Sequence, residues 1–276
     1  MPNLNRNLFY DSLEELLQIS NLDEKFAKFR EFYSAFKEGK FNNFQRMTPP
    51  KPLFEPSYKQ ICNIVPIKQS SKIKSKNKEA LFLHNIAHIE YSAIEIALDA
   101  CYRFEMMPRE FYSDWLEVAS DEIRHFCMIE SCLCKSGFKY GDFAVHDGLF
   151  VALKKTENSL IERMALLPRF MEANGLDANK FIIERLKKEG KEDIIALLEV
   201  ILKEEVSHVY KGDKWFKWCC KKSGLECEKL YFDIILKHYP NSFSNKRELN
   251  MEARLEAGFS LDELKKIEEL QERALR

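Results

Sequence analysis

Apolar residues recur every three or four positions over most of the chain, which is the pattern of amphipathic helices. Proline and glycine residues divide the pattern: Pro108 opens a helical segment, and Gly137, Gly190 and Gly224 follow the ends of others. We expect long helices at about 77–106, 108–136, 149–188 with an interruption around Asn174–Gly175, and 191–223. The segment 138–150 between the second and third of these suits a long crossover.

Shorter patterned segments flank these four helices. Residues 11–38 have helical spacing, and five prolines between 49 and 66 exclude a long helix from residues 40–75, which we interpret as an extended arm packed on the domain. A further helix is expected at about 226–239, and the capping-box pattern of Ser260 and Glu263 opens a last one. The expected division is therefore 1–75 for N-terminal helices and arm, 76–224 for a bundle and 225–276 for a helical extension.

Composition supports an all-α globular fold. The 276 residues include nine glycines and nine prolines, few for a turn-rich β protein, and 45% of them are hydrophobic. The net charge of −1 makes nucleic acid an unfavoured partner. No stretch has the length of a membrane span and the first residues do not form a signal peptide, so we expect a cytoplasmic protein whose eight cysteines are reduced and mostly in the core.

Two Glu-x-x-His pairs carry the candidate chemistry, Glu122 with His125 and Glu205 with His208. Residues three apart share one face of a helix, so each pair can present a carboxylate and an imidazole to one metal ion. Both pairs lie among apolar positions, where an unpaired charge would cost several kcal/mol unless a cation compensated for it. The alternative is two ordinary amphipathic helices with Glu and His at the edge of the apolar face.

Spacing suggests two further carboxylates. Two antiparallel helices joined by a turn bring together residues that are equally far from that turn. Glu90 and Glu122 have their midpoint at residue 106, beside the turn expected before Pro108, so they should lie opposite each other. Glu172 pairs in the same way with Glu205 across the turn at Gly190. Glu162 is the reserve candidate. It is less suitable than Glu172, because its midpoint with Glu205 falls inside a helical segment and not at a turn. The six candidate ligands are Glu90, Glu122, His125, Glu172, Glu205 and His208.

Several other residues are ambiguous. His84 and His88 lie four apart and can bind a metal, although a partly exposed helix face explains them as well. His146 and Asp147 in the crossover can reach a site or brace the loop, and bracing is favoured. Two tyrosines lie close in sequence to candidate ligands and could be redox-active, Tyr91 and Tyr210. For both of them an ordinary position in the core is favoured.

The ligand pattern resembles that of the ferritin-like superfamily of di-iron carboxylate proteins. Over residues 80–260 the chain is similar to an uncharacterised bacterial ferritin-like family, in the segments HIEYSAIEIALDA, DWLEVASDEIRHF, YGDFAVHDG, MALLPRFMEANGLD and EEVSHV. The resemblance implies a four-helix bundle with a long crossover and two metal ions, each with a terminal Glu and a His and bridged by Glu122 and Glu205. Iron is the best match for such hard ligands, with manganese as the alternative.

Three functions fit this pattern. The first is an oxidoreductase that activates dioxygen or peroxide on an unknown small-molecule or macromolecular substrate; the resemblance leaves tRNA open because similar bundles modify it. The second is iron handling or peroxide detoxification without an organic substrate. The third is a non-enzymatic protein with a structural metal. A homodimer is compatible with each.

Overall fold

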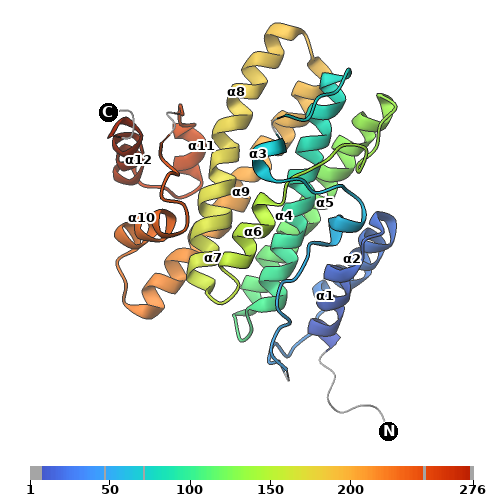
Figure 1. The fold of residues 1–276 in the computed structure, drawn as a ribbon. Helices are drawn as coiled ribbons and strands as arrows, with labels where there is room; N and C mark the ends of the chain where they lie inside the picture. Colours follow the sequence, from blue (N-terminus) through green and yellow to red (C-terminus); the bar gives the residue numbers. More distant parts are fainter. Residues whose placement is uncertain (1–7, 47, 71, 245–246, 274–276) are drawn as a thin grey trace. The chain divides into compact units, whose positions relative to one another are not determined.

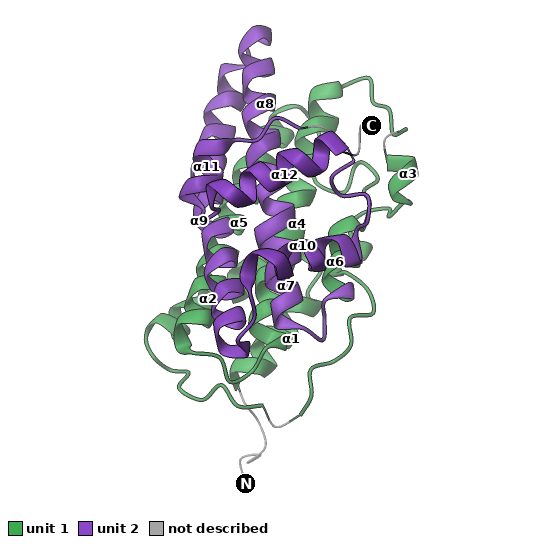
Figure 2. Cartoon of the chain, turned by 90° about the vertical axis from the view of Figure 1, so that its left-hand side faces the viewer, with its two compact units in different colours: residues 1–154 green, residues 155–276 purple. Residues whose placement is uncertain are grey.

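In a computed structural model, residues 8–46, 48–70, 72–244 and 247–273 are described, and they are all-helical. Over these ranges the only β-type pairing is one isolated parallel bridge between Ile64 and Val145. The chain divides into two compact units, 1–154 and 155–276, shown in Figure 2. None of the helices within the described ranges has the length and apolar character that crossing a membrane requires.

The first unit is built on a helical hairpin, and Figure 1 shows its two long helices side by side. Its elements are α1 (Leu8–Gln18), α2 (Leu22–Lys37), η1 (Ser57–Gln60), α3 (Ile67–Ser70), α4 (Lys78–Arg103), α5 (Arg109–Lys135) and α6 (Gly148–Lys155). Asn21 and Asn77 cap α2 and α4, because each side chain accepts a hydrogen bond from a backbone N–H of the first turn. The two helices expected at 77–106 and 108–136 are confirmed as α4 and α5.

The arm before α4 lies against the first unit, as its apolar residues predict. Tyr58 is 1% exposed and meets the rings of His88 and Tyr91 edge-on. Backbone hydrogen bonds join the arm to the crossover loop, since Val65 N donates to Val145 O at 2.8 Å. Phe54 of the arm differs from Tyr58, because 75% of it is exposed.

The second unit holds another hairpin, in which α9 contacts α7, η2 and α8. Its elements are α7 (Leu160–Leu166), the π-helical segment η2 (Leu167–Glu172), α8 (Ala173–Glu189), α9 (Glu192–Ser223), α10 (Cys227–His238), α11 (Met251–Glu256) and α12 (Leu261–Arg273). Gly190 ends α8 in the left-handed conformation, and the capping box of α12 forms as expected, with reciprocal bonds between Ser260 and Glu263.

The expected interruption of the third long helix at Gly175 is wrong. Gly175 lies inside α8, because one glycine costs a helix only about 1 kcal/mol, which packing readily offsets. The helix is interrupted earlier, between α6 and α7, where Ser159 caps α7 by accepting from Glu162 N. The winding then changes again in η2, where π-type hydrogen bonds span five residues rather than four.

Gly212 of α9 allows η2 to pack closely on α9. A Cβ atom at Gly212 would lie 2.6 Å from Pro168 Cβ, so we expect Gly212→Ala to destabilise the protein by about 1–3 kcal/mol. Gly175→Ala is the matched control: no atom lies within 4 Å of its added Cβ, so we expect a gain of about 0.5–1 kcal/mol. Urea unfolding measures both, and equal effects of the two substitutions would contradict this account.

Candidate metal site

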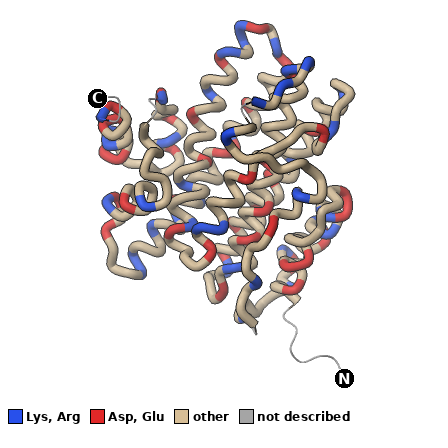
Figure 3. Tube along the Cα trace, in the orientation of Figure 1, with Lys and Arg blue, Asp and Glu red and all other residues tan. Residues whose placement is uncertain are grey.

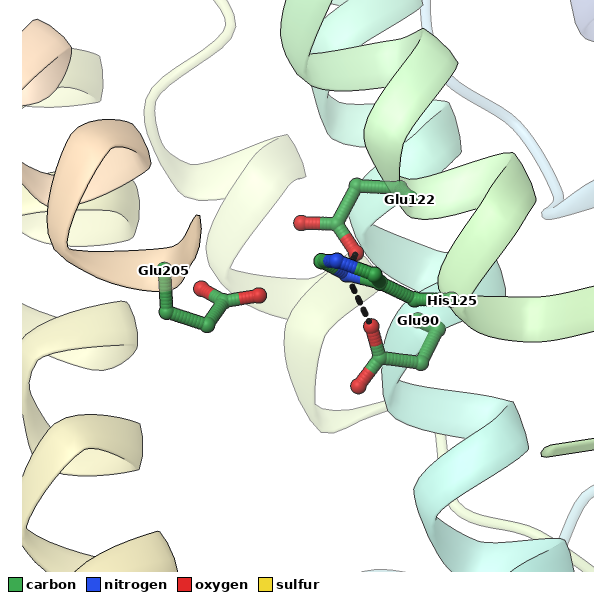
Figure 4. A group of neighbouring side chains, drawn as sticks. All are labelled: Glu90, Glu122, His125 and Glu205. Atoms are coloured by element: carbon green, nitrogen blue, oxygen red, sulfur yellow. Dashed lines mark hydrogen bonds and ion pairs between the residues drawn. The ribbon is translucent and has the colours of Figure 1, made fainter. Parts of the chain in front are cut away.

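A buried cluster of two carboxylates and one imidazole lies between α4 and α5. Glu90 is 5% exposed, Glu122 1% and His125 0%. His125 Nδ1 lies 3.2 Å from Glu90 Oε2 and 3.5 Å from Glu122 Oε2, and Figure 4 shows the Glu90 and His125 side chains converging from the two helices. Antiparallel α4 and α5, joined by residues 104–108, bring these residues to the same height, as the midpoint at 106 predicts.

The cluster attracts positive charge. Burial lowers the pKa of His125, but contact with Glu122 and Glu90 outweighs burial and raises that pKa to about 11. Carboxylate oxygens and an imidazole nitrogen are ligands for divalent first-row metals, so this buried cluster can hold a metal ion.

The second Glu-x-x-His pair lies on α9 in the other unit. His208 is fully buried, and its Nδ1 lies 3.6 Å from Glu205 Oε1. Glu172 is the last residue of η2, the segment that packs against α9. The second unit therefore places all three of its candidate ligands on two elements in contact with each other. π-Helical turns often occur at functional sites, which is consistent with a ligand at the end of this one.

Glu162, the reserve candidate, is engaged elsewhere. It lies at the start of α7, where its carboxylate accepts hydrogen bonds from Lys237 Nζ and His238 Nε2, both at 2.7 Å. These contacts lower its pKa against the opposing effect of partial burial. A carboxylate neutralised by two partners on α10 is a poor candidate ligand, which favours Glu172.

One interpretation placed His84 and His88 on a partly exposed helix face. That interpretation is wrong, because the two residues are 0% and 5% exposed. His84 Nε2 accepts from Gly141 N at 2.9 Å, and His88 Nε2 bonds His146 O at 2.8 Å. His146 in turn accepts from Gly148 N. These histidines therefore tie the crossover loop to α4, which agrees with the bracing interpretation of His146.

The pKa of His84 makes stability depend on pH. Burial lowers it from 6.5 to about 4, against a small opposing effect of Asp142. Between pH 6.5 and 4 the unfolded chain binds a proton that the folded one excludes, so stability falls as the pH falls through this window. We expect His84→Gln to reduce that loss by about 2–3 kcal/mol, measured by urea unfolding at pH 7 and pH 4.5. An unchanged pH dependence would contradict it.

The sequence did not point to a buried charged network around Lys25. Lys25 of α2 is fully buried, and its Nζ binds Ser57 Oγ at 2.9 Å, Tyr91 OH at 3.0 Å and Glu95 Oε1 at 3.0 Å. The signal was present, because Lys25 precedes the buried Phe29 by four positions and so belongs to the apolar face of α2.

Two other expectations are only partly confirmed. Tyr91 is fully buried, but Tyr210 is 50% exposed, so the core position favoured for it is wrong. All eight cysteines are free, yet only four of them are buried: Cys62, Cys101, Cys219 and Cys220.

Fold and site together define an all-α protein with a buried carboxylate–histidine cluster. The chain belongs to the family described as "Protein of unknown function (DUF455)", whose profile matches residues 18–265. It is 38% identical over 200 residues to an uncharacterized protein of Haemophilus influenzae, a match that covers 70% of this chain and 69% of the relative. No solved structure matches the chain significantly.

Proposed function

We propose that the two hairpins form a ferritin-like four-helix bundle with a di-metal centre at its core. The hairpins correspond: α4 and α5 carry Glu90 and Glu122-x-x-His125, while η2 with α8 and α9 carry Glu172 and Glu205-x-x-His208. Each half supplies two carboxylates and one imidazole. The same order of candidate ligands in both hairpins, a Glu followed by Glu-x-x-His, supports this pairing.

The donor set favours iron, with manganese as the alternative. The six proposed ligands, four carboxylates and two imidazoles, are hard or intermediate ligands and include no cysteine. Four carboxylates also balance the charge of two divalent ions. The buried histidines hold their ring nitrogens beside these carboxylates, so metal binding would displace the proton that His125 otherwise holds.

We propose that the protein is an oxidoreductase that activates dioxygen or peroxide on an organic substrate. When bound as a reduced pair, iron ions supply two electrons to dioxygen. The residues of the chain hold the metals in a dry site: Glu122 and His125 are 1% and 0% exposed, and Leu116 and Val118 on the same helix are equally buried. This burial is the observation that carries the proposal, because a site shielded from water protects reactive oxygen species from side reactions.

The charge distribution favours a substrate other than nucleic acid. Figure 3 shows basic and acidic residues interspersed along the helices, and the net charge is −1. A net charge close to zero gives no general positive field that would attract nucleic acid. We therefore propose a small organic substrate. We also propose a cytoplasmic location, where cellular reductants can reduce the metals again after each reaction.

The test measures metal and oxygen together. Protein purified aerobically and analysed for elements should contain about two irons per chain, the stoichiometry of a di-metal carboxylate site. After anaerobic reduction, exposure to air should consume about one dioxygen per pair of irons. Protein that binds iron tightly but consumes no oxygen would be a structural metal protein and would overturn the proposed activity.

A further inference from the structure

A cavity lies in the first unit, away from the cluster of Glu90, Glu122 and His125. Its volume is about 280 Å³, and it is lined by residues of α1, the arm, α4 and α6. This volume is slightly below the range of about 300–1,000 Å³ that is usual for small-molecule sites, so it suits a very small ligand. Glu95 lines this cavity and follows the candidate ligand Glu90 by five residues, so the two side chains leave α4 roughly 140° apart. The cavity is therefore distinct from the metal cluster.

Two polar residues of the cavity belong to the network around Lys25. Ser57 and Glu95 line it and are 8% and 5% exposed. Glu95 uses one oxygen, Oε1, for both Lys25 Nζ and Ser57 Oγ. Over the described residues no hydrogen bond reaches its other oxygen, Oε2. A carboxylate held in place by one oxygen thus offers the second as an acceptor to a donor in the cavity.

The charges around the cavity cancel in pairs. Lys25 neutralises Glu95 at 3.0 Å, and Arg103 binds Asp99 at 2.8 Å. At the arm, Lys51 pairs with Glu14. A charged ligand would find no unbalanced counter-charge here and would lose its hydration, so the cavity favours an uncharged one.

Much of the remaining lining is apolar, and the other polar residues in it are Gln18, Glu55, which pairs with Lys59, and Tyr102. Phe150 and Leu153 of α6 are 8% and 2% exposed, and Leu17 of α1 and Pro56 of the arm add to the same lining. Phe54 also lines the cavity but is 75% exposed. A large aromatic side chain that is left in water beside a cavity becomes buried when an apolar molecule fills that cavity.

We propose that this cavity binds a small uncharged molecule with an apolar body and one hydrogen-bond donor, such as a hydroxyl group. The donor binds Glu95 Oε2, and the apolar body lies between Leu153 and Phe54. The proposal does not depend on the metal site, since every residue that carries it lies on another face of α4 or on other elements.

Hexan-1-ol is the probe, with hexanoate and hexylammonium as charged analogues of similar length. Titration of the full-length chain, labelled with ¹³C in the leucine methyl groups, should shift the signals of Leu17, Leu53 and Leu153. We expect the alcohol to bind at least about tenfold more tightly than either ion, because each ion must be desolvated without a counter-charge. No shift up to the solubility limit of the alcohol would overturn the site, and tighter binding of an ion would overturn the assignment of an uncharged ligand.

A second experiment substitutes the exposed aromatic residue Phe54. We expect Phe54→Ser to weaken hexan-1-ol binding about tenfold without unfolding the protein, because the side chain is exposed before the ligand binds. Phe181→Ser is the matched control, since Phe181 is 67% exposed on α8 of the other unit, and it should leave the affinity unchanged. Equal affinities of the two variants would overturn the proposal. Glu122→Gln should also bind the alcohol normally, which separates this site from the metal centre.

Discussion

Glu122→Gln is expected to lower metal affinity by at least about 100-fold, because even residues that only support metal ligands contribute 10- to 100-fold. The amide has almost the shape of the carboxylate but carries no charge, and Glu122 is 1% exposed in direct contact with His125. The iron content of purified protein should therefore fall from about two per chain to a small fraction of that value. Elemental analysis after gel filtration measures it.

Glu130→Gln is the matched control. Glu130 lies on the same helix, α5, is partly buried, and accepts from Tyr140 N rather than facing His125. We expect this variant to retain its iron. If both variants keep their iron, the cluster of Glu90, Glu122 and His125 is not the metal site.

Glu205→Gln decides whether the second unit shares the site. The proposed centre requires a loss of iron as large as that of Glu122→Gln, because each bridging carboxylate serves both metals. Glu199→Gln on the same helix is the control, since Glu199 is exposed and pairs only with Lys187 at the surface. Loss of iron in Glu122→Gln together with full retention in Glu205→Gln would confine the site to the first unit.

Local spacing explains why much of the site was predictable. Glu122 and His125 are three apart on one helix, so their proximity follows from helical geometry. Glu90 was found from the turn before Pro108, because a short antiparallel hairpin fixes which residues lie opposite each other. The observed contact between Glu90 and His125 at 3.2 Å agrees with that reasoning.

Features that depend on packing between distant segments were not predictable. The π-helical segment η2 contains Pro168, which lacks a backbone donor, but its close contact with α9 depends on the missing side chain of Gly212, more than forty positions away. Lys25 lies on the apolar face of α2, but its partners Ser57 and Glu95 are 32 and 70 positions away, so spacing along the chain does not identify them. The burial of His84 likewise depends on backbone N–H groups of the crossover loop.

Arg169→Met is expected to cost the second unit about 3–5 kcal/mol, because it leaves the buried carboxylate of Glu263 without its counter-charge. Arg169 of η2 is fully buried, with Nε 2.7 Å from Asp213 Oδ1 and Nη2 2.6 Å from Glu263 Oε1. Its guanidinium also lies over the ring of Tyr231, at 4.1 Å from the centroid. Since η2 also carries Glu172, this network holds the candidate ligand in place. Urea unfolding of the metal-free protein measures the loss.

Two companion variants separate lost charge pairing from lost packing. Arg169→Met combined with Glu263→Gln removes the charge that the single substitution leaves unpaired, while the amide can still accept from Ser260 N in the capping box; we expect it to recover about 1–3 kcal/mol. Asp213 keeps Lys217 as a partner at 2.8 Å in both variants. Arg185→Met, at an arginine of α8 whose side chain is 51% exposed, should change stability by less than about 0.5 kcal/mol. If the double variant is no more stable than Arg169→Met, the guanidinium stabilises the unit through its packing on the aromatic rings and not through its charge.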